Sequence, residues 1–250
     1  MPPTSSPTSN ERWSASRSTS ALAGFAAVSV ILIALAFAGQ AADSGRAGTS
    51  DTLFRYEFAV GSLVAYGILV GLTWVIARAF PDRPRAALGL RAFAPRWLGI
   101  ALALTLLAVV VSTALEPVLH AGEEQGLAPD RWQDNRAPAF ALNAAVVVLA
   151  VPFAEELFFR GLGVRALGFL GLAPSVLLTA AIFALAHGLP AAIPALGFFA
   201  LALGYVRYRS ESVWPGVIAH ASYNLVGILV ALYVALDRDG QGAAALGLVF

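Results

Sequence analysis

Long apolar runs follow one another along almost the whole chain and are separated by short charged segments. Each run is close to the roughly 20 residues that an α-helix needs to cross a bilayer. Seven such runs lie at 21–42, 58–77, 97–115, 138–166, 172–187, 191–208 and 213–236. Because 58% of the residues are hydrophobic and only 12% are charged, the chain has too little polar surface to cover a soluble globule of its size. The sequence therefore predicts an all-α polytopic transmembrane bundle of about seven spans.

The charged segments between the runs predict how the bundle is oriented. Arg residues gather before the first run and in the second, fourth and sixth loops, for example at Arg78, Arg83 and Arg209. Acidic residues gather in the other loops, for example at Asp43 and Glu116. Because cytoplasmic loops of membrane proteins carry an excess of Arg and Lys, this alternation predicts an N-terminus inside and a C-terminus outside.

The two ends of the chain differ from its apolar part. Residues 1–20 are rich in Ser, Thr and Pro and bury too little apolar area to fold, which predicts a disordered N-terminal tail. We expect three N-terminal spans with their loops at 21–137, a core of spans at 138–236 and a C-terminal tail at 237–250. The first run ends in small residues that resemble a signal-peptide cleavage site, but it is longer than a usual signal-peptide core.

Composition also narrows the location and the partners. All sixteen basic residues are Arg, a bias that indicates a bacterial genome rich in G and C and hence a bacterial inner membrane. The net charge of +1 and the lack of an Arg cluster with interleaved aromatic residues predict no nucleic-acid partner. The chain has no Cys, which excludes disulfides, thiolate nucleophiles and Cys-based zinc sites.

Two carboxylates and a guanidinium interrupt the apolar run 138–166, at Glu155, Glu156 and Arg160. Charged groups at such a depth cost roughly 2.5 to 3.5 kcal/mol each, so they are kept only when partnered and usually because they have a function. Glu156 and Arg160 are four residues apart, with the acid on the amino-terminal side, which favours a helical ion pair that braces the helix. Glu155 points about 100° away and remains the candidate general base. The alternative is a structural ion pair of Glu155, for example with Arg165, near a helix end.

Each of two later runs contributes one histidine. His187 ends the run 172–187, and His220 lies in the last run, four residues before Asn224 and on the same helix face. A rise of 1.5 Å per residue from the predicted helix ends places Glu155, His187, His220 and Asn224 in one slab near the middle of the bilayer. This common depth favours a functional site over separate structural histidines.

These residues resemble the motifs of a known family. The three motifs are Glu155-Glu156-x-x-x-Arg160, Phe183-x-x-x-His187 and His220-x-x-x-Asn224. In this order, on late transmembrane segments, they resemble the CAAX-prenyl-protease and bacteriocin-processing (CPBP, or Abi) intramembrane proteases. The resemblance covers residues 138–236 and implies an endopeptidase, named a metalloprotease in the family, that cleaves membrane-associated or CAAX-like protein substrates. The three N-terminal spans match nothing specific.

Two mechanisms remain open for such a site. In the version that we favour, which requires no cofactor, Glu155 with help from His187 takes a proton from the attacking water, and His220 and Asn224 donate hydrogen bonds to the oxyanion. In the other version, His187, His220 and a glutamate such as Glu155 hold Zn²⁺ with an open fourth position. Asn224 favours the first version, because Asn is an uncommon zinc ligand.

Two functions of other classes also fit buried Glu and His residues. One is a catalytically silent immunity or scaffold protein that binds a peptide in the membrane. The other is a proton-coupled transporter, in which the same groups form a proton relay. The lack of a visible repeat between the two halves of the chain speaks against a transporter, since many transporters are built from paired repeats.

Overall fold

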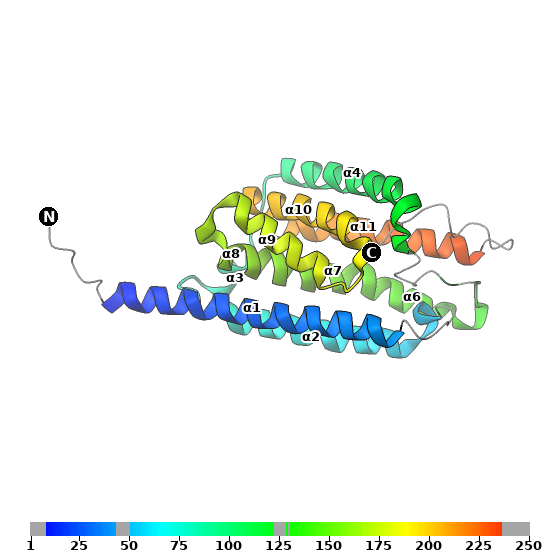
Figure 1. Cartoon of the computed structure of the whole chain (residues 1–250), viewed down its shortest axis with the longest axis horizontal. Coiled ribbons are helices and arrows are strands. Elements are labelled where there is room, and N and C mark those ends of the chain that lie inside the picture. The colour runs from blue at the N-terminus through cyan, green and yellow to red at the C-terminus, as the bar shows by residue number, and fades with distance from the viewer. Residues whose placement is uncertain (1–8, 44–50, 123–128, 130, 237–250) are drawn as a thin grey trace.

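The computed structural model of the chain is a bundle of helices that run roughly along one direction (Figure 1). The structure describes residues 9–43, 51–122, 129 and 131–236. Every regular element in these residues is helical, and none is a strand. The all-α prediction is therefore confirmed for the described part of the chain, whereas the C-terminal tail predicted at 237–250 lies outside it.

Six helices in the described residues are long and apolar enough to cross a membrane. The apolar stretches are Ser18–Ala42, Tyr56–Ala77, Arg96–Leu119, Asp134–Ala166, Pro190–Ser210 and Trp214–Tyr233. They belong to α1 (Ser9–Asp43), α2 (Tyr56–Ala77), α4 (Arg96–Leu119), the helix built around α6 to α8, α10 (Ile193–Ser210) and α11 (Trp214–Leu236). The chain is thus a multi-pass membrane protein.

The remaining predicted span, 172–187, forms the shorter helix α9 (Leu172–Leu185). Its 14 residues reach about 21 Å at 1.5 Å per residue, less than the roughly 30 Å of a bilayer core. The helix ends there because Gly188 has a φ of 67° and Pro190 starts the next turn. The count of seven full spans is therefore not confirmed, and the orientation of the termini stays a prediction.

Helix α1 starts earlier than the composition indicates. It begins at Ser9, inside the stretch predicted as a disordered tail, and continues without interruption to Asp43. Residues 1–8 lie outside the described part, so the division of the chain at residue 20 stays a prediction.

The central helix of the bundle is α-helical with two π-helical segments along its length. It consists of α6 (Ala137–Ala145), a π-helical segment η3 (Val146–Ala150), α7 (Val151–Glu155), a second π-helical segment η4 (Glu156–Gly163) and α8 (Val164–Ala166). It packs against α2 on one side and against α9, α10 and α11 on the other (Figure 1). All eight residues of η4 are buried. Glu155, Glu156 and Arg160 of this helix are therefore buried in protein and do not face lipid, and π-helical turns of this kind are frequent at functional sites.

Candidate active site

Glu155 ends α7 and is 6% exposed. Its Oε1 accepts a hydrogen bond of 2.9 Å from the Tyr66 hydroxyl of α2. Its Oε2 has no hydrogen-bond partner among the described residues and lies 3.8 Å from His220 Nε2. Arg165, the structural partner considered for Glu155, pairs with Asp82 at 2.8 Å instead. Glu155 therefore keeps one oxygen free.

Glu156 forms the predicted ion pair with Arg160. Arg160 donates to Glu156 Oε1 at 2.8 Å, and neither side chain has any exposed area. The same carboxylate oxygen lies 3.1 Å from His220 Nδ1. This oxygen accepts the hydrogen bond from Arg160, so in its contact with His220 it acts as an acceptor and Nδ1 acts as the donor. In a neutral ring this leaves Nε2 of His220 unprotonated and facing Glu155.

The Arg160 guanidinium is held by two further contacts. One nitrogen donates to the backbone oxygen of Ala200 at 3.4 Å, and Cζ lies 4.2 Å from the centroid of the Phe183 ring. A desolvated cation over an aromatic face is stabilised by about 2 kcal/mol. Phe183, which begins the second motif, thus supports the cation of the first motif.

His220 is fixed by aromatic rings as well as by Glu156. The edges and faces of Phe183 and Phe199 approach its ring, with centroid distances of 5.8 and 5.2 Å. Phe199 in turn stacks on Tyr223 at 4.3 Å, and the Tyr223 hydroxyl is hydrogen bonded to Ser112 of α4. The imidazole therefore has little rotational freedom, because the two aromatic rings and the Nδ1 hydrogen bond restrict its orientation.

Asn224 has a structural contact that the sequence did not indicate. Its Nδ2 donates to the backbone oxygen of Val147 at 2.9 Å, and its Oδ1 is buried without a partner. Val147 lies in η3, where backbone bonds run from residue i+5. The residue five positions on is Pro152, which has no N–H, so the Val147 oxygen needs another donor. One Nδ2 hydrogen of Asn224 fills this need and the second remains available.

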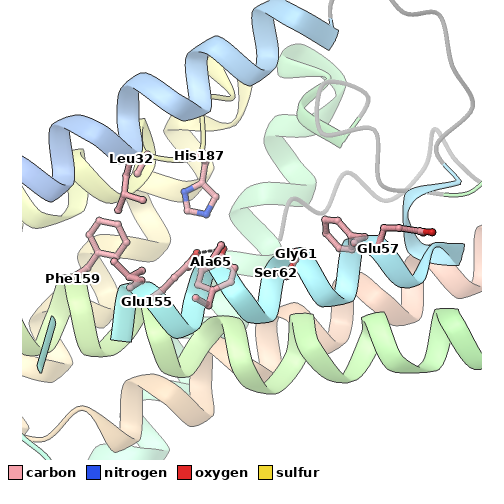
Figure 2. A pocket seen from close by; sticks show the side chains of 12 residues that line it. Leu32, Glu57, Gly61, Ser62, Ala65, Glu155, Phe159 and His187 are labelled. Carbon is pink, nitrogen blue, oxygen red and sulfur yellow. Dashed lines mark hydrogen bonds between the residues drawn. The ribbon is translucent and has the colours of Figure 1, made fainter. Parts of the chain in front are cut away.

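His187 follows the end of α9 and is partly buried. Its Nδ1 lies 2.8 Å from the backbone oxygen of Phe183. A carbonyl oxygen only accepts, so Nδ1 carries the proton and Nε2 is free. In Figure 2 the ring stands above Glu155, on the far side of the cavity from α2.

All four predicted catalytic residues line one cavity of about 180 Å³. These are Glu155, His187, His220 and Asn224. A second cavity of about 580 Å³ shares Glu155 and His187 and continues between α1 and α2 toward Glu57, at the start of α2 (Figure 2). The structure thus brings the four residues together and provides space for a substrate beside them.

Two residues of this site escaped the sequence analysis. Tyr66 holds Glu155, and Ser62, one helical turn earlier, lines both cavities. Their signal is the spacing of Phe58, Ser62 and Tyr66, each four residues apart on one face of α2, with two polar groups in an apolar span. The first spans therefore do contribute to the site.

The residues considered for zinc do not form a complete ligand set. Nδ1 of His187 and of His220 each contacts an oxygen, as in metal-bound histidines, which leaves both Nε2 atoms free. Among the described residues, however, no three His, Asp or Glu side chains converge closely enough to hold a metal ion. Glu155, His187 and His220 as arranged therefore do not fit a zinc centre.

Comparison with known families identifies the segment that carries this site. Residues 137–226 match the sequence model of the family described as type II CAAX prenyl endopeptidase, Rce1-like. This match supports membership of the CPBP family. The matched segment contains all three motifs, and the family makes the protein a membrane peptidase of the CAAX type. No curated protein and no solved structure matches the chain.

The CPBP match starts after the third long helix. It therefore includes the central helix and α9 to most of α11, but not α2, which supplies Tyr66. The predicted family is confirmed, whereas the roles of single residues stay predictions.

Proposed function

We propose that this CPBP protein is an intramembrane endopeptidase in which Glu155 activates water without a metal ion. The observation that carries the proposal is the difference between the two Glu155 oxygens. Oε1 is held by Tyr66, whereas Oε2 is unpartnered among the described residues, and Glu155 lines the cavity together with His187 and His220. A buried carboxylate oxygen that is free in a cavity can accept a proton from water.

The reaction that follows is hydrolysis of a peptide bond. A water between Glu155 Oε2 and His187 attacks the carbonyl carbon, and Glu155 takes one of its protons as the new C–O bond forms. The electron pair of the carbonyl bond moves to its oxygen. Glu155 then returns the proton to the peptide nitrogen as the C–N bond breaks. The electron pair of the oxyanion re-forms the carbonyl bond, which gives a carboxylic acid and an amine. The proton of the acid then moves to the amine, so that the products are a carboxylate and an ammonium group.

The oxyanion is stabilised from the α11 side of the cavity. Asn224 has a second Nδ2 hydrogen beyond the one that it gives to Val147. His220 can donate from Nε2 only when its ring carries two protons, since Nδ1 already donates to Glu156. Removing a donor of this kind costs about 2.7 to 4 kcal/mol of transition-state stabilisation.

The buried charges support a doubly protonated His220 during the reaction. Two carboxylates, Glu155 and Glu156, face one guanidinium, Arg160, within the same buried cluster. An imidazolium at His220 makes the sum of the four charges zero. Buried charges are tolerated when they are balanced and hydrogen bonded, so Glu156 and Arg160 serve the site as a charged support.

The substrate is a peptide segment that reaches the cavity from the membrane. The larger cavity has Leu32 of α1 on one wall and the exposed small residues Gly61 and Ala65 of α2 on the other, which leaves room for an extended chain. Membrane-associated proteins, including those with CAAX-like ends, are the class that this site would take. We place the protein in a bacterial inner membrane, with no nucleic-acid partner.

A cleavage assay with the purified full-length chain tests the proposal. The substrates are a library of membrane-inserting peptides and of peptides with CAAX-like ends. The enzymes are the wild type, Glu155→Gln and a control, Asp134→Asn, which removes an exposed carboxylate that lines neither of these two cavities. We expect cleavage by the wild type and the control and none by Glu155→Gln. Full activity of Glu155→Gln would overturn the proposed base, and binding without cleavage by the wild type would favour a silent scaffold.

A further inference from the structure

A third cavity, of about 460 Å³, lies at the end of the bundle that carries the basic loops. It is enclosed by α3 (Pro84–Ala87), α8 and the end of α10, which gather at one end of the molecule in Figure 1. It shares no lining residue with the two cavities at Glu155. Eight consecutive buried residues of η4 lie between Glu155 and α8. This cavity is therefore separate from the proposed active site.

Three guanidinium groups and two carboxylates line this cavity. Arg91 pairs with Glu211, and Arg165 pairs with Asp82 at 2.8 Å, with all four side chains between 42% and 66% exposed. These two ion pairs form the solvent-facing rim. The third cation, Arg207, leaves the cavity with a formal charge of +1.

Arg207 differs from the rim residues in burial and in pairing. It is 7% exposed, its Nε has no hydrogen-bond partner, and no described carboxylate forms an ion pair with it. Glu211 lines the same cavity and attracts this cation, but it is paired with Arg91, and both Arg91 and Arg165 repel Arg207. A buried guanidinium without an ion-pair partner of its own destabilises a fold unless something else compensates it. An anion in the cavity would supply this compensation.

The chain holds the Arg207 head group in place. A Cβ atom on Gly89 would lie 2.7 Å from Arg207 Cζ, so the guanidinium packs directly on a residue that has no side chain. Gly89 has a φ of 72° and its oxygen accepts a hydrogen bond from Val213 N, which ties the loop before α4 to the start of α11. The loop before α4 and the start of α11 therefore fix the position of the Arg207 guanidinium.

We propose that this cavity binds the phosphate group of an anionic phospholipid. The planar fork of a guanidinium matches two phosphate oxygens, and basic pockets at the ends of transmembrane helices bind lipid headgroups. The cavity lies where α2, α8 and α10 end, at the level of the bilayer surface. Phe169, next to the lining residue Gly168, is 72% exposed, as aromatic residues at the membrane interface are. The acyl chains would then lie along the outer face of the bundle.

A binding titration with a matched pair of variants tests this site. The full-length protein in detergent is titrated with phosphatidylglycerol, and the lipid-bound fraction is measured by native mass spectrometry. We expect Arg207→Gln to weaken binding about tenfold or more, because it removes a charged hydrogen-bond donor. Arg209→Gln makes the same charge change at an exposed position of α10, and we expect it to stay within about twofold of the wild type. Equal affinity of these two variants would overturn the proposal.

A second variant keeps Arg207 and so does not depend on how its removal affects folding. Ala86 lines the cavity, and Ala86→Glu would give Arg207 a carboxylate from the protein itself. We expect this variant to fold and to lose phosphatidylglycerol binding, and unchanged binding would contradict the site. Inorganic phosphate is the last probe: if it binds the wild type as tightly as the lipid does, and with the same dependence on Arg207, the ligand is free phosphate and the lipid assignment is wrong.

Discussion

The Tyr66 hydroxyl and Glu155 Oε1 are hydrogen bonded at 2.9 Å although 89 residues separate them in the sequence. The contact joins α2 to the end of α7, and it determines which carboxylate oxygen remains free. The family match begins at residue 137, so this interaction connects the matched core to the part of the chain before it. The proposed base is therefore oriented by a residue outside the three motifs.

Replacing Tyr66 by Phe removes this hydrogen bond and leaves the ring. We expect kcat to fall about 10- to 100-fold with KM within about twofold, because a hydrogen bond to a charged group contributes roughly 1.5 to 3 kcal/mol. Steady-state cleavage kinetics measure both constants. Tyr56→Phe, at an exposed position of the same helix, is the control. A parallel loss of activity and thermal stability in Tyr66→Phe would show a role in folding only.

Glu156→Gln tests the buried ion pair. The variant leaves the Arg160 guanidinium, which has no exposed area, without its counter-charge. We expect a loss of about 3 to 5 kcal/mol in the free energy of unfolding, measured by thermal or denaturant unfolding in detergent. Asp82→Asn breaks the exposed pair with Arg165 and should cost less than about 1 kcal/mol.

The double variant Glu156→Gln, Arg160→Met separates the loss of the pair from the burial of a lone charge. It removes both charged groups, so we expect it to regain part of the stability lost in Glu156→Gln. It should nevertheless remain inactive, because His220 loses the carboxylate that faces its Nδ1 at 3.1 Å. A double variant that is less stable than Glu156→Gln would contradict this explanation.

Sequence spacing was sufficient to predict which polar residues of the core lie together. The i,i+4 order of Glu156 and Arg160 predicts their ion pair, and helical rise predicts the common depth of Glu155 and His220, because both follow from local helix geometry. The length of α9 was not predictable in this way, since Gly188 ends it before the apolar pattern does.

Contacts that depend on tertiary structure also could not be predicted from the sequence. The hydrogen bond of Asn224 to Val147 arises because a π-helical segment aligns Val147 with Pro152, and apolar periodicity does not reveal such a segment. Tyr66 reaches Glu155 only through the packing of α2 on the central helix. Both interactions form between segments far apart in the chain, where no spacing rule applies.

Gly216→Ala tests how closely α11 approaches the central helix. A Cβ atom at Gly216 would lie 2.8 Å from Glu156 Oε2, a distance that real Cβ atoms do not show. We expect the carboxylate to shift, and its contacts with Arg160 and His220 to weaken, with a loss of stability and of cleavage activity. Gly197→Ala in α10 is the control, because nothing lies within 4 Å of its Cβ position. That substitution should be neutral or slightly stabilising, since Ala favours a helix over Gly by up to about 1 kcal/mol.

Chelation separates the two mechanisms that the residue types allow. In the metal-free mechanism, the free Oε2 of Glu155 acts on water directly, so cleavage should persist within about twofold after treatment with a strong zinc chelator and dialysis. Added Zn²⁺ should then give no increase, and metal analysis of the active protein should find less than stoichiometric zinc. Complete loss of activity that Zn²⁺ alone restores would instead require Glu155, His187 and His220 to move together around the ion, since the described residues hold no converged set of three ligands. In that case Glu155 would be a zinc ligand and Glu156 would be the remaining carboxylate. The variant Glu155→Gln would then lower the zinc content as well as the activity. The metal-free mechanism predicts that this variant changes the activity alone.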